Sequence, residues 1–115
     1  MKSDTFFISS ITENIKVIEK FVENAEYKDF LKDVKTQFAV FKAFENIGEA
    51  VKGLSKKIRS HYPDIPWKEI AGLRDKLIHG YFGIEPKIVW KTIEEDIPKL
   101  KLYISEVKTG LKNEK

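Results

Sequence analysis

The side chains best suited to chemistry lie in one short stretch, residues 74–81, which contains Arg74, Asp75, His79 and Tyr81. Arginine can hold phosphate oxygens with a planar fork of donors, and histidine can exchange a proton near neutral pH. A fixed cation close to a proton-transfer group suits phosphoryl chemistry, in which positioning and charge stabilisation dominate. Taken by themselves, an Arg and a His at this spacing also fit an ordinary exposed helix.

The spacing of these groups limits how one chain could use them together. On an ideal α-helix, Arg74 and His79 lie roughly 140° apart, whereas Tyr81 lies within about 20° of Arg74. Arg74 and His79 therefore do not share a face. A site that uses both requires a distorted helix end, a far-reaching Arg side chain, or residues from two chains.

Composition excludes several other classes of site. The 115 residues include no Cys and only two His, which excludes disulfide scaffolds, thiol catalysis and Cys-based zinc sites. Any metal site would depend on carboxylates. The 21 Lys and Arg against 18 Asp and Glu give a net charge of +3. This charge permits a nucleic-acid partner without requiring one.

Apolar spacing predicts a chain that is helical throughout. The apolar share of 42% suffices for one core, so we expect a single domain over residues 1–115. Sparse Gly and Pro separate four predicted helices, at about 4–24, 33–60, 67–81 and 86–107, with a helical turn near 27–31 and a fraying tail. The predicted fold is therefore an all-α, antiparallel up-and-down bundle of four to five helices.

The helix predicted over 33–60 carries more apolar surface than one core face needs. Its stripe is predicted to consist of Val34, Phe38, Phe41, Ile47, Val51, Leu54 and Ile58, widened by Phe44 and Ala50. The set of Phe indicates an additional buried face, which a homodimer would use. No apolar run reaches the ~18 residues that a membrane span needs, so we expect no membrane partner and a cytoplasmic protein.

The pattern Arg-x4-His-x-Tyr, formed by Arg74, His79 and Tyr81, resembles the signature of the HepT-like branch of the HEPN superfamily. Other segments are similar to the same family and occur in the same order: I-G-E-A at 47–50, Y-P-D-I-P-W at 62–67, Trp90, and D-I-P-K-L at 96–100. The resemblance covers about residues 33–100, and this ordered combination is specific where the Arg–His spacing alone is not.

The resemblance implies a metal-independent endoribonuclease toxin of a type VII toxin–antitoxin system, with the helical bundle of the HEPN fold. Arg74 and His79 would be its catalytic residues. The family acts as a homodimer in which both copies of the motif line one cleft, which meets the geometric requirement above. The cognate antitoxin is a minimal nucleotidyltransferase that attaches AMP to the motif tyrosine, here Tyr81, and thereby inactivates the toxin.

Three further residues are candidates for supporting the cleft. Asp75 stands where relatives commonly carry Asn after the motif Arg, and its carboxylate could support the charge of Arg74. Lys42 stands near a position where relatives commonly carry Arg, and it keeps the charge but loses the bidentate fork. Glu49, in the I-G-E-A segment, could face the cleft.

Other interpretations stay open at this point. The chain could be a non-catalytic nucleotide-binding or accessory subunit of a minimal nucleotidyltransferase, or a purely structural helical dimer. Lys52, Lys56 and Arg59 have the spacing of one helix face, which fits a solvated surface better than a path for the RNA backbone.

Overall fold

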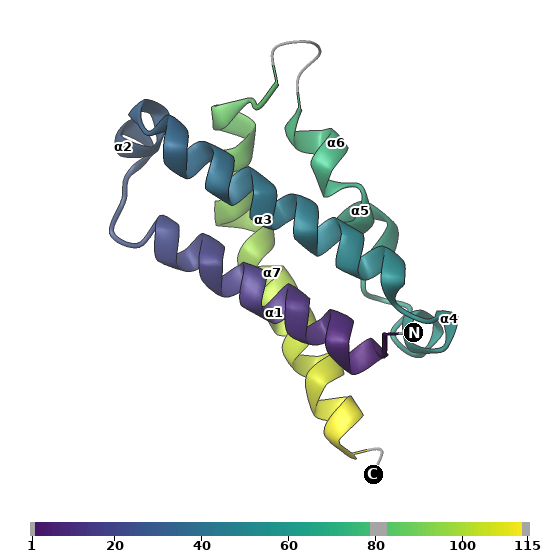
Figure 1. Ribbon diagram of the computed structural model, residues 1–115. Helices are drawn as coiled ribbons and strands as arrows, with labels where there is room; N and C mark the ends of the chain where they lie inside the picture. The colour runs from purple at the N-terminus through teal and green to yellow at the C-terminus, as the bar shows by residue number, and fades with distance from the viewer. Residues whose placement is uncertain (1, 79–82, 114–115) are drawn as a thin grey trace.

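Helices make up most of the computed structural model, which describes residues 2–78 and 83–113. In chain order they are α1 (Asp4–Phe21), α2 (Tyr27–Lys32), α3 (Val34–Gly53), α4 (Lys56–His61), α5 (Trp67–Ala71), α6 (Leu73–Leu77) and α7 (Pro86–Asn113). Figure 1 shows no strand in these ranges, and Ile78 and Ile84 form an isolated bridge. The prediction of an all-α fold is therefore confirmed.

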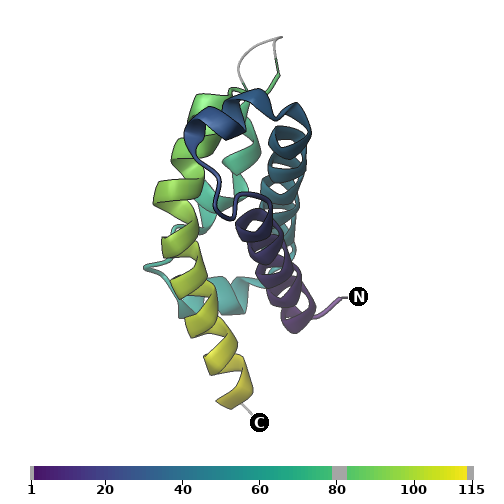
Figure 2. The same ribbon diagram turned by 90° about the vertical axis from the view of Figure 1, so that its left-hand side faces the viewer.

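The three long helices, α1, α3 and α7, enclose the core. α1 and α3 run antiparallel side by side, and α7 crosses behind them (Figure 1). Figure 2, turned by 90°, shows α7 along one side of the molecule and α1 and α3 along the other. α5 and α6 both pack against α3. No helix in the described part of the chain is long and apolar enough to cross a membrane.

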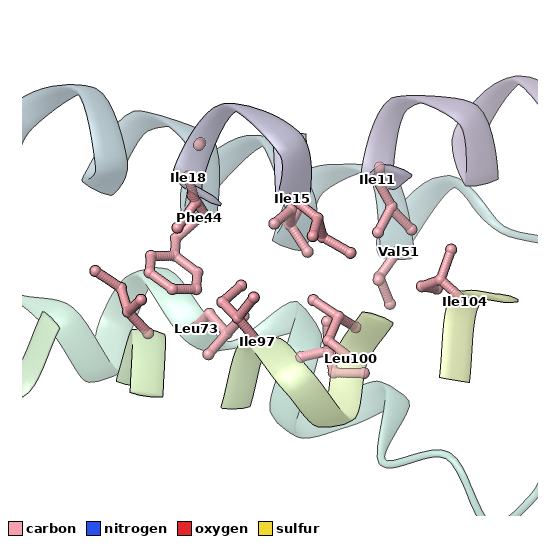
Figure 3. Close-up of a cluster of buried hydrophobic side chains, with 14 of the residues drawn as sticks. Ile11, Ile15, Ile18, Phe44, Val51, Leu73, Ile97, Leu100 and Ile104 are labelled. Carbon is pink, nitrogen blue, oxygen red and sulfur yellow. The ribbon is translucent and has the colours of Figure 1, made fainter. Parts of the chain in front are cut away.

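Apolar side chains spaced by three and four residues fill the space between the helices (Figure 3). This is the spacing that places side chains on one helix face. The side chains that α1 and α7 bury at the centre are at most 4% exposed: Ile11, Ile15, Ile18, Ile97, Leu100 and Ile104. The helices predicted over 4–24 and 86–107 are thus confirmed as α1 and α7.

The C-terminal tail is helical further than predicted. α7 continues through Pro98 and ends at Asn113, so the expectation of a fraying segment from residue 108 is wrong for the part that the structure describes. Val107 is fully buried and Leu111 packs against the core. Packing of one apolar face holds this last part of the helix in place, although its sequence is polar.

The inward face of α3 differs from the predicted one in its first half. Val34 and Phe38 were expected in the core but are 58% and 61% exposed. The core positions there are Gln37, Val40, Ala43 and Phe44. Gln37 turns inward because its side-chain amide donates to the carbonyl oxygens of Phe30 at 2.8 Å and Leu31 at 3.2 Å. Val34, Phe38 and the half-buried Phe41 form what we call the outer stripe of α3.

The helix predicted over 33–60 is broken after Gly53, because Leu54 and Ser55 are extended. The Asp4 carboxylate accepts hydrogen bonds from the Ser55 amide at 2.8 Å and from its hydroxyl at 2.6 Å. The same hydroxyl accepts from the Ile58 amide and caps α4. A capping serine satisfies a backbone donor that a new helix leaves free, so this cap starts α4 in a new direction.

The helix predicted over 67–81 is also divided. The Gly72 amide donates to the Lys68 carbonyl at 3.1 Å and closes α5. α6 then ends at Leu77, and Ile78 is extended, with φ −101° and ψ 136°. α5 comes very close to α3 at Gly48, where an added Cβ would stand 2.9 Å from the Ala71 carbonyl oxygen. Gly48 is therefore required by the close approach of α5.

Candidate active site

Arg74 lies on the outer face of α6, the five-residue helix that packs against α3. Leu73 and Leu77, on either side of it in sequence, are 5% and 0% exposed and anchor the helix in the core. The Arg74 side chain is half exposed. The local sequence therefore fixes the backbone of α6 by its two leucines and presents the guanidinium at the surface.

Glu45 of α3 holds the Arg74 guanidinium. The Arg74 Nε donates a hydrogen bond to Glu45 Oε2 at 2.7 Å, and Lys42 Nζ donates to the other carboxylate oxygen, Oε1, at 3.2 Å. A charge-assisted hydrogen bond as short as the 2.7 Å bond from Arg74 is among the stronger ones that proteins form. Because Glu45 engages Nε, the terminal nitrogens of Arg74 are not used in this bond and can face a ligand.

These two hydrogen bonds lower the pKa of the Glu45 carboxyl below its ordinary value, and the bond from Arg74 has the larger effect. Glu45 is therefore ionised at neutral pH and balances the charge of its neighbours. Sequence reasoning missed Glu45. The spacing of the sequence could have identified it, because Glu45 lies three residues after Lys42 and four before Glu49. Residues at this spacing share one face of a helix.

Of the other two supporting candidates, Asp75 forms an ion pair with Arg74 and Glu49 forms one with Lys52. Asp75 Oδ1 stands 3.7 Å from Arg74 Nη1, beyond hydrogen-bonding distance, and its side chain is 88% exposed. Glu49 lies one helical turn further along α3 and pairs with Lys52 at 3.1 Å. The structure thus gathers Lys42 and Arg74 around Glu45, with Asp75 beside Arg74, and Glu49 belongs to the neighbouring pair.

His79 and Tyr81 lie outside the described residues. The described residues on either side are held together, because Ile78 and Ile84 form an antiparallel bridge and the Glu85 amide donates to the Leu77 carbonyl at 3.2 Å. On an ideal helix, Arg74 and His79 would lie roughly 140° apart. That angle does not apply, because α6 ends at Leu77.

The contacts of α5 and α6 with α3 define a seam, which we call the α3–α6 seam. Arg74 lies opposite Glu45, and three residues back Ala71 lies opposite Gly48. The chain of α5 and α6 therefore runs antiparallel to α3 along this seam. At the Arg74 end, two cations, Lys42 and Arg74, face two carboxylates, Glu45 and Asp75, so that these four charges cancel.

Comparison with known proteins identifies relatives over most of the chain. The family model described as ribonuclease HepT-like matches residues 11–107. A Thermococcus cleftensis protein named "Probable ribonuclease HepT" is 48% identical over 100 residues, which are 87% of this chain and 91% of the relative. A Methanocaldococcus jannaschii protein named "Putative RNase MJ1216" is 46% identical over 101 residues, 88% of this chain and 84% of the relative. No solved structure matches the chain at a significant level.

Proposed function

This chain belongs to the ribonuclease HepT-like family, and from that premise we propose that it is a metal-independent endoribonuclease of the HEPN kind. The observation that carries the proposal is the Arg74 guanidinium, which Glu45 fixes through Nε at 2.7 Å while the side chain stays half exposed. An arginine oriented in this way is prepared to hold the non-bridging oxygens of a phosphodiester.

The proposed reaction is an in-line displacement within RNA. The 2′-oxygen attacks the adjacent phosphorus, the bond from phosphorus to the 5′-oxygen breaks, and the products are a 2′,3′-cyclic phosphate and a 5′-hydroxyl. One proton leaves the 2′-hydroxyl and one is delivered to the 5′-oxygen. His79 carries out one of these transfers, and the second copy of the chain supplies the complementary group. Arg74 stabilises the charge that builds on the phosphate in the transition state.

The supporting residues act through these groups in this proposal. Lys42 holds the second oxygen of Glu45 and so helps to set the position of Arg74. Asp75 offers Arg74 a weak, solvated second carboxylate at 3.7 Å. Glu49 acts only indirectly, through its ion pair with Lys52.

The outer stripe of α3 supports a homodimer. Val34 and Phe38 are large apolar side chains that the single chain leaves more than half exposed. On a helix, positions 34, 38, 41 and 45 follow one another at intervals of three and four, so the stripe leads directly to Glu45. Exposed apolar patches of this kind mark interaction sites. A second copy covering the stripe would bring the two Arg74 sites close to one interface.

Regulation by a nucleotidyltransferase antitoxin completes the proposal and makes the chain the toxin of a type VII toxin–antitoxin system. The partner would join the Tyr81 oxygen to the α-phosphorus of ATP and release pyrophosphate. The AMP group adds bulk and negative charge, which repel RNA. Intact mass after co-expression with such a partner tests this step, because wild type is expected to gain AMP and Tyr81→Phe is not.

Cleavage of RNA by the purified chain in excess EDTA tests the catalytic proposal. His79→Ala and Arg74→Ala are each expected to lower the rate by at least about 100-fold, the usual contribution of a proton-transfer group and of a group that stabilises transition-state charge. His61→Ala is the matched control, because His61 is the other of the two histidines in the chain and lies at the end of α4, where it packs against Tyr62. Products should end in a 2′,3′-cyclic phosphate. Intact RNA together with tight nucleotide binding would instead favour a non-catalytic accessory subunit.

A further inference from the structure

An open groove lies where α3, α4 and α5 meet. Its volume is about 550 Å³, and its lining residues are Lys52, Lys56, Arg59, Ser60, Trp67, Lys68 and Ala71. We call it the basic groove, because four of these residues are cations and none is acidic. Lys68 comes from α5, so the sequence spacing of Lys52, Lys56 and Arg59 did not reveal the groove.

Three of these four cations have no acidic partner among residues 2–78 and 83–113. Lys52 pairs with Glu49 at 3.1 Å, whereas Lys56, Arg59 and Lys68 form no ion pair within the part of the chain that the structure describes. The Arg59 Nε is buried without a hydrogen-bond partner among those residues. An anion that enters the groove therefore displaces no carboxylate of the described residues from these three side chains.

The basic groove continues the α3–α6 seam. Along α3, Glu45 faces Arg74, Gly48 faces Ala71, and Lys52 lines the groove together with Lys68 and Ala71. Lys52 lies seven positions after Glu45, which corresponds to about 10 Å along the helix axis. A strand lying in the groove can thus reach Arg74 by following the seam.

The charges around Arg74 explain why this site needs the basic groove in order to attract a polyanion. The four charges around Glu45 cancel, so that end of the seam supplies little attraction for a polyanion. Binding to nucleic acid depends mainly on cations that neutralise phosphates, and a groove of positive charge that follows the backbone is the usual arrangement for single strands. The basic groove supplies the positive charge that the neighbouring site lacks.

We propose that the basic groove binds the phosphate backbone of single-stranded RNA and guides the strand along the α3–α6 seam to Arg74. This inference rests on the proposed ribonuclease function for its choice of RNA. An acidic protein would also be attracted by the cations. RNA fits the site better, because the groove leads to an arginine whose terminal nitrogens are available for phosphate.

The test separates binding from cleavage by using a single-stranded RNA whose 2′-hydroxyls are methylated. Such RNA keeps its phosphates and cannot undergo 2′-oxygen attack. Lys56→Gln/Lys68→Gln is compared with Lys16→Gln/Lys20→Gln, which removes the same charge from exposed positions of α1. Anisotropy titrations at several salt concentrations give the Kd and its salt dependence for both pairs. Arg59→Gln is measured separately, with its melting temperature, because its Nε is buried.

The groove variant is expected to raise the Kd on the order of tenfold or more at 0.1 M salt and to reduce the slope of log Kd against log salt by about 1.4, since each single-strand phosphate contact contributes about 0.7. The α1 variant should match wild type in slope. Equal effects of the two pairs, or no effect of either, overturn the inference. Loss of polyglutamate binding with RNA binding intact also overturns it, in favour of an acidic protein.

Cleavage of unmodified RNA distinguishes this inference from the proposed function. If both hold, the groove variant raises KM and leaves kcat unchanged, because it removes contacts made equally in the ground state and the transition state. Cleavage with an unchanged KM in the groove variant overturns the groove alone. If wild type binds methylated RNA through the groove but leaves unmodified RNA intact, the catalytic proposal fails and the groove stands.

Discussion

Arg74 Nε and Glu45 Oε2 lie 2.7 Å apart and join α6 to α3 across 29 positions of sequence. Glu45 is less exposed than its partner, with 24% of its side chain accessible against 51% for Arg74. The carboxylate therefore belongs to the fixed surface of α3, and the guanidinium is positioned against it. The direction of the Arg74 guanidinium is thus set by Glu45, a residue outside the Arg-x4-His-x-Tyr pattern.

Glu45→Gln is expected to lower kcat for RNA cleavage by on the order of 10-fold to 100-fold, because small displacements of a positioned group are costly. RNA affinity should stay equal or increase, since a negative charge is removed next to the phosphate site. Stopped-flow or single-turnover kinetics with a separate binding titration resolves the two effects.

Glu19→Gln is the matched control for this variant, because Glu19 forms a comparable pair with Lys101 at 2.9 Å between α1 and α7. It should leave kcat unchanged. If Glu45→Gln lowers RNA affinity and kcat together, Glu45 contributes to the RNA-binding surface of the protein and does not position Arg74.

The pH dependence of stability follows from the lowered pKa of Glu45. A carboxyl whose pKa is lower in the folded state stabilises the protein above its unfolded pKa, near 4.5, and loses that contribution as pH falls through the folded value. Urea unfolding of wild type and of Glu45→Gln gives the free energy of unfolding of each protein from pH 7 to pH 3. The difference, wild type minus variant, should be largest at neutral pH and vanish in acid.

Taking the difference removes the contribution of Asp33, whose pKa is lowered in the same direction by hydrogen bonds from the Thr36 hydroxyl and amide. The contribution of Glu45 should be of the size of a surface pair, about 0.2–1 kcal/mol. A difference that grows as pH falls would contradict the assignment of the Arg74 bond as the cause.

Periodicity predicted α1 and α7 well because the buried apolar residues of each helix recur at every turn. In α1 the buried Ile11, Ile15 and Ile18 follow one another at intervals of four and three, although Phe6, Val17 and Phe21 add exposed apolar side chains to the same helix. α3 carries two stripes, one through Val40, Phe44 and Ile47 and one through Val34 and Phe38. Spacing does not choose between them, and the choice depends on where α2 and α1 pack.

The parts of the site that sequence could not predict depend on contacts between distant segments. The break at Ser55 arises because Asp4, 51 positions away, accepts two of its hydrogen bonds. The partner of Arg74 depends on the direction in which α6 lies along α3. The basic groove likewise needs Lys68 from a different helix. Local patterns identified Arg74 as a candidate, but its partner and its surroundings required the fold.

Asp4→Ala is expected to destabilise the protein by about 1–3 kcal/mol, because it leaves the part-buried Ser55 amide and hydroxyl without their partner. Urea unfolding at neutral pH measures the change. Asp64→Ala, at an exposed position between α4 and α5, is the control and should change stability by less than about 0.5 kcal/mol. Equal stability of the two variants would mean that Gly53 and Leu54 break the helix without help from Asp4.

Phe38→Glu tests the proposed homodimer and its link to catalysis. Phe38 is 61% exposed on the outer stripe of α3, so replacing it removes no core contact and the fold should keep its melting temperature. If a second copy buries this ring, the symmetric dimer loses two rings, at about 1.5–3 kcal/mol each, which corresponds to a dimer Kd raised by roughly 150-fold or more. Sedimentation equilibrium over a range of concentrations measures this shift.

Leu102→Glu is the control for Phe38→Glu, because Leu102 is still more exposed, at 73%, and lies on α7. It adds the same charge and should leave the dimer intact. Cleavage provides the second measurement: if the site is completed by the second copy, RNA cleavage by Phe38→Glu should fall in proportion to the monomer fraction and recover at high protein concentration. A monomeric Phe38→Glu that cleaves RNA at the wild-type rate would show that one chain contains the whole active site.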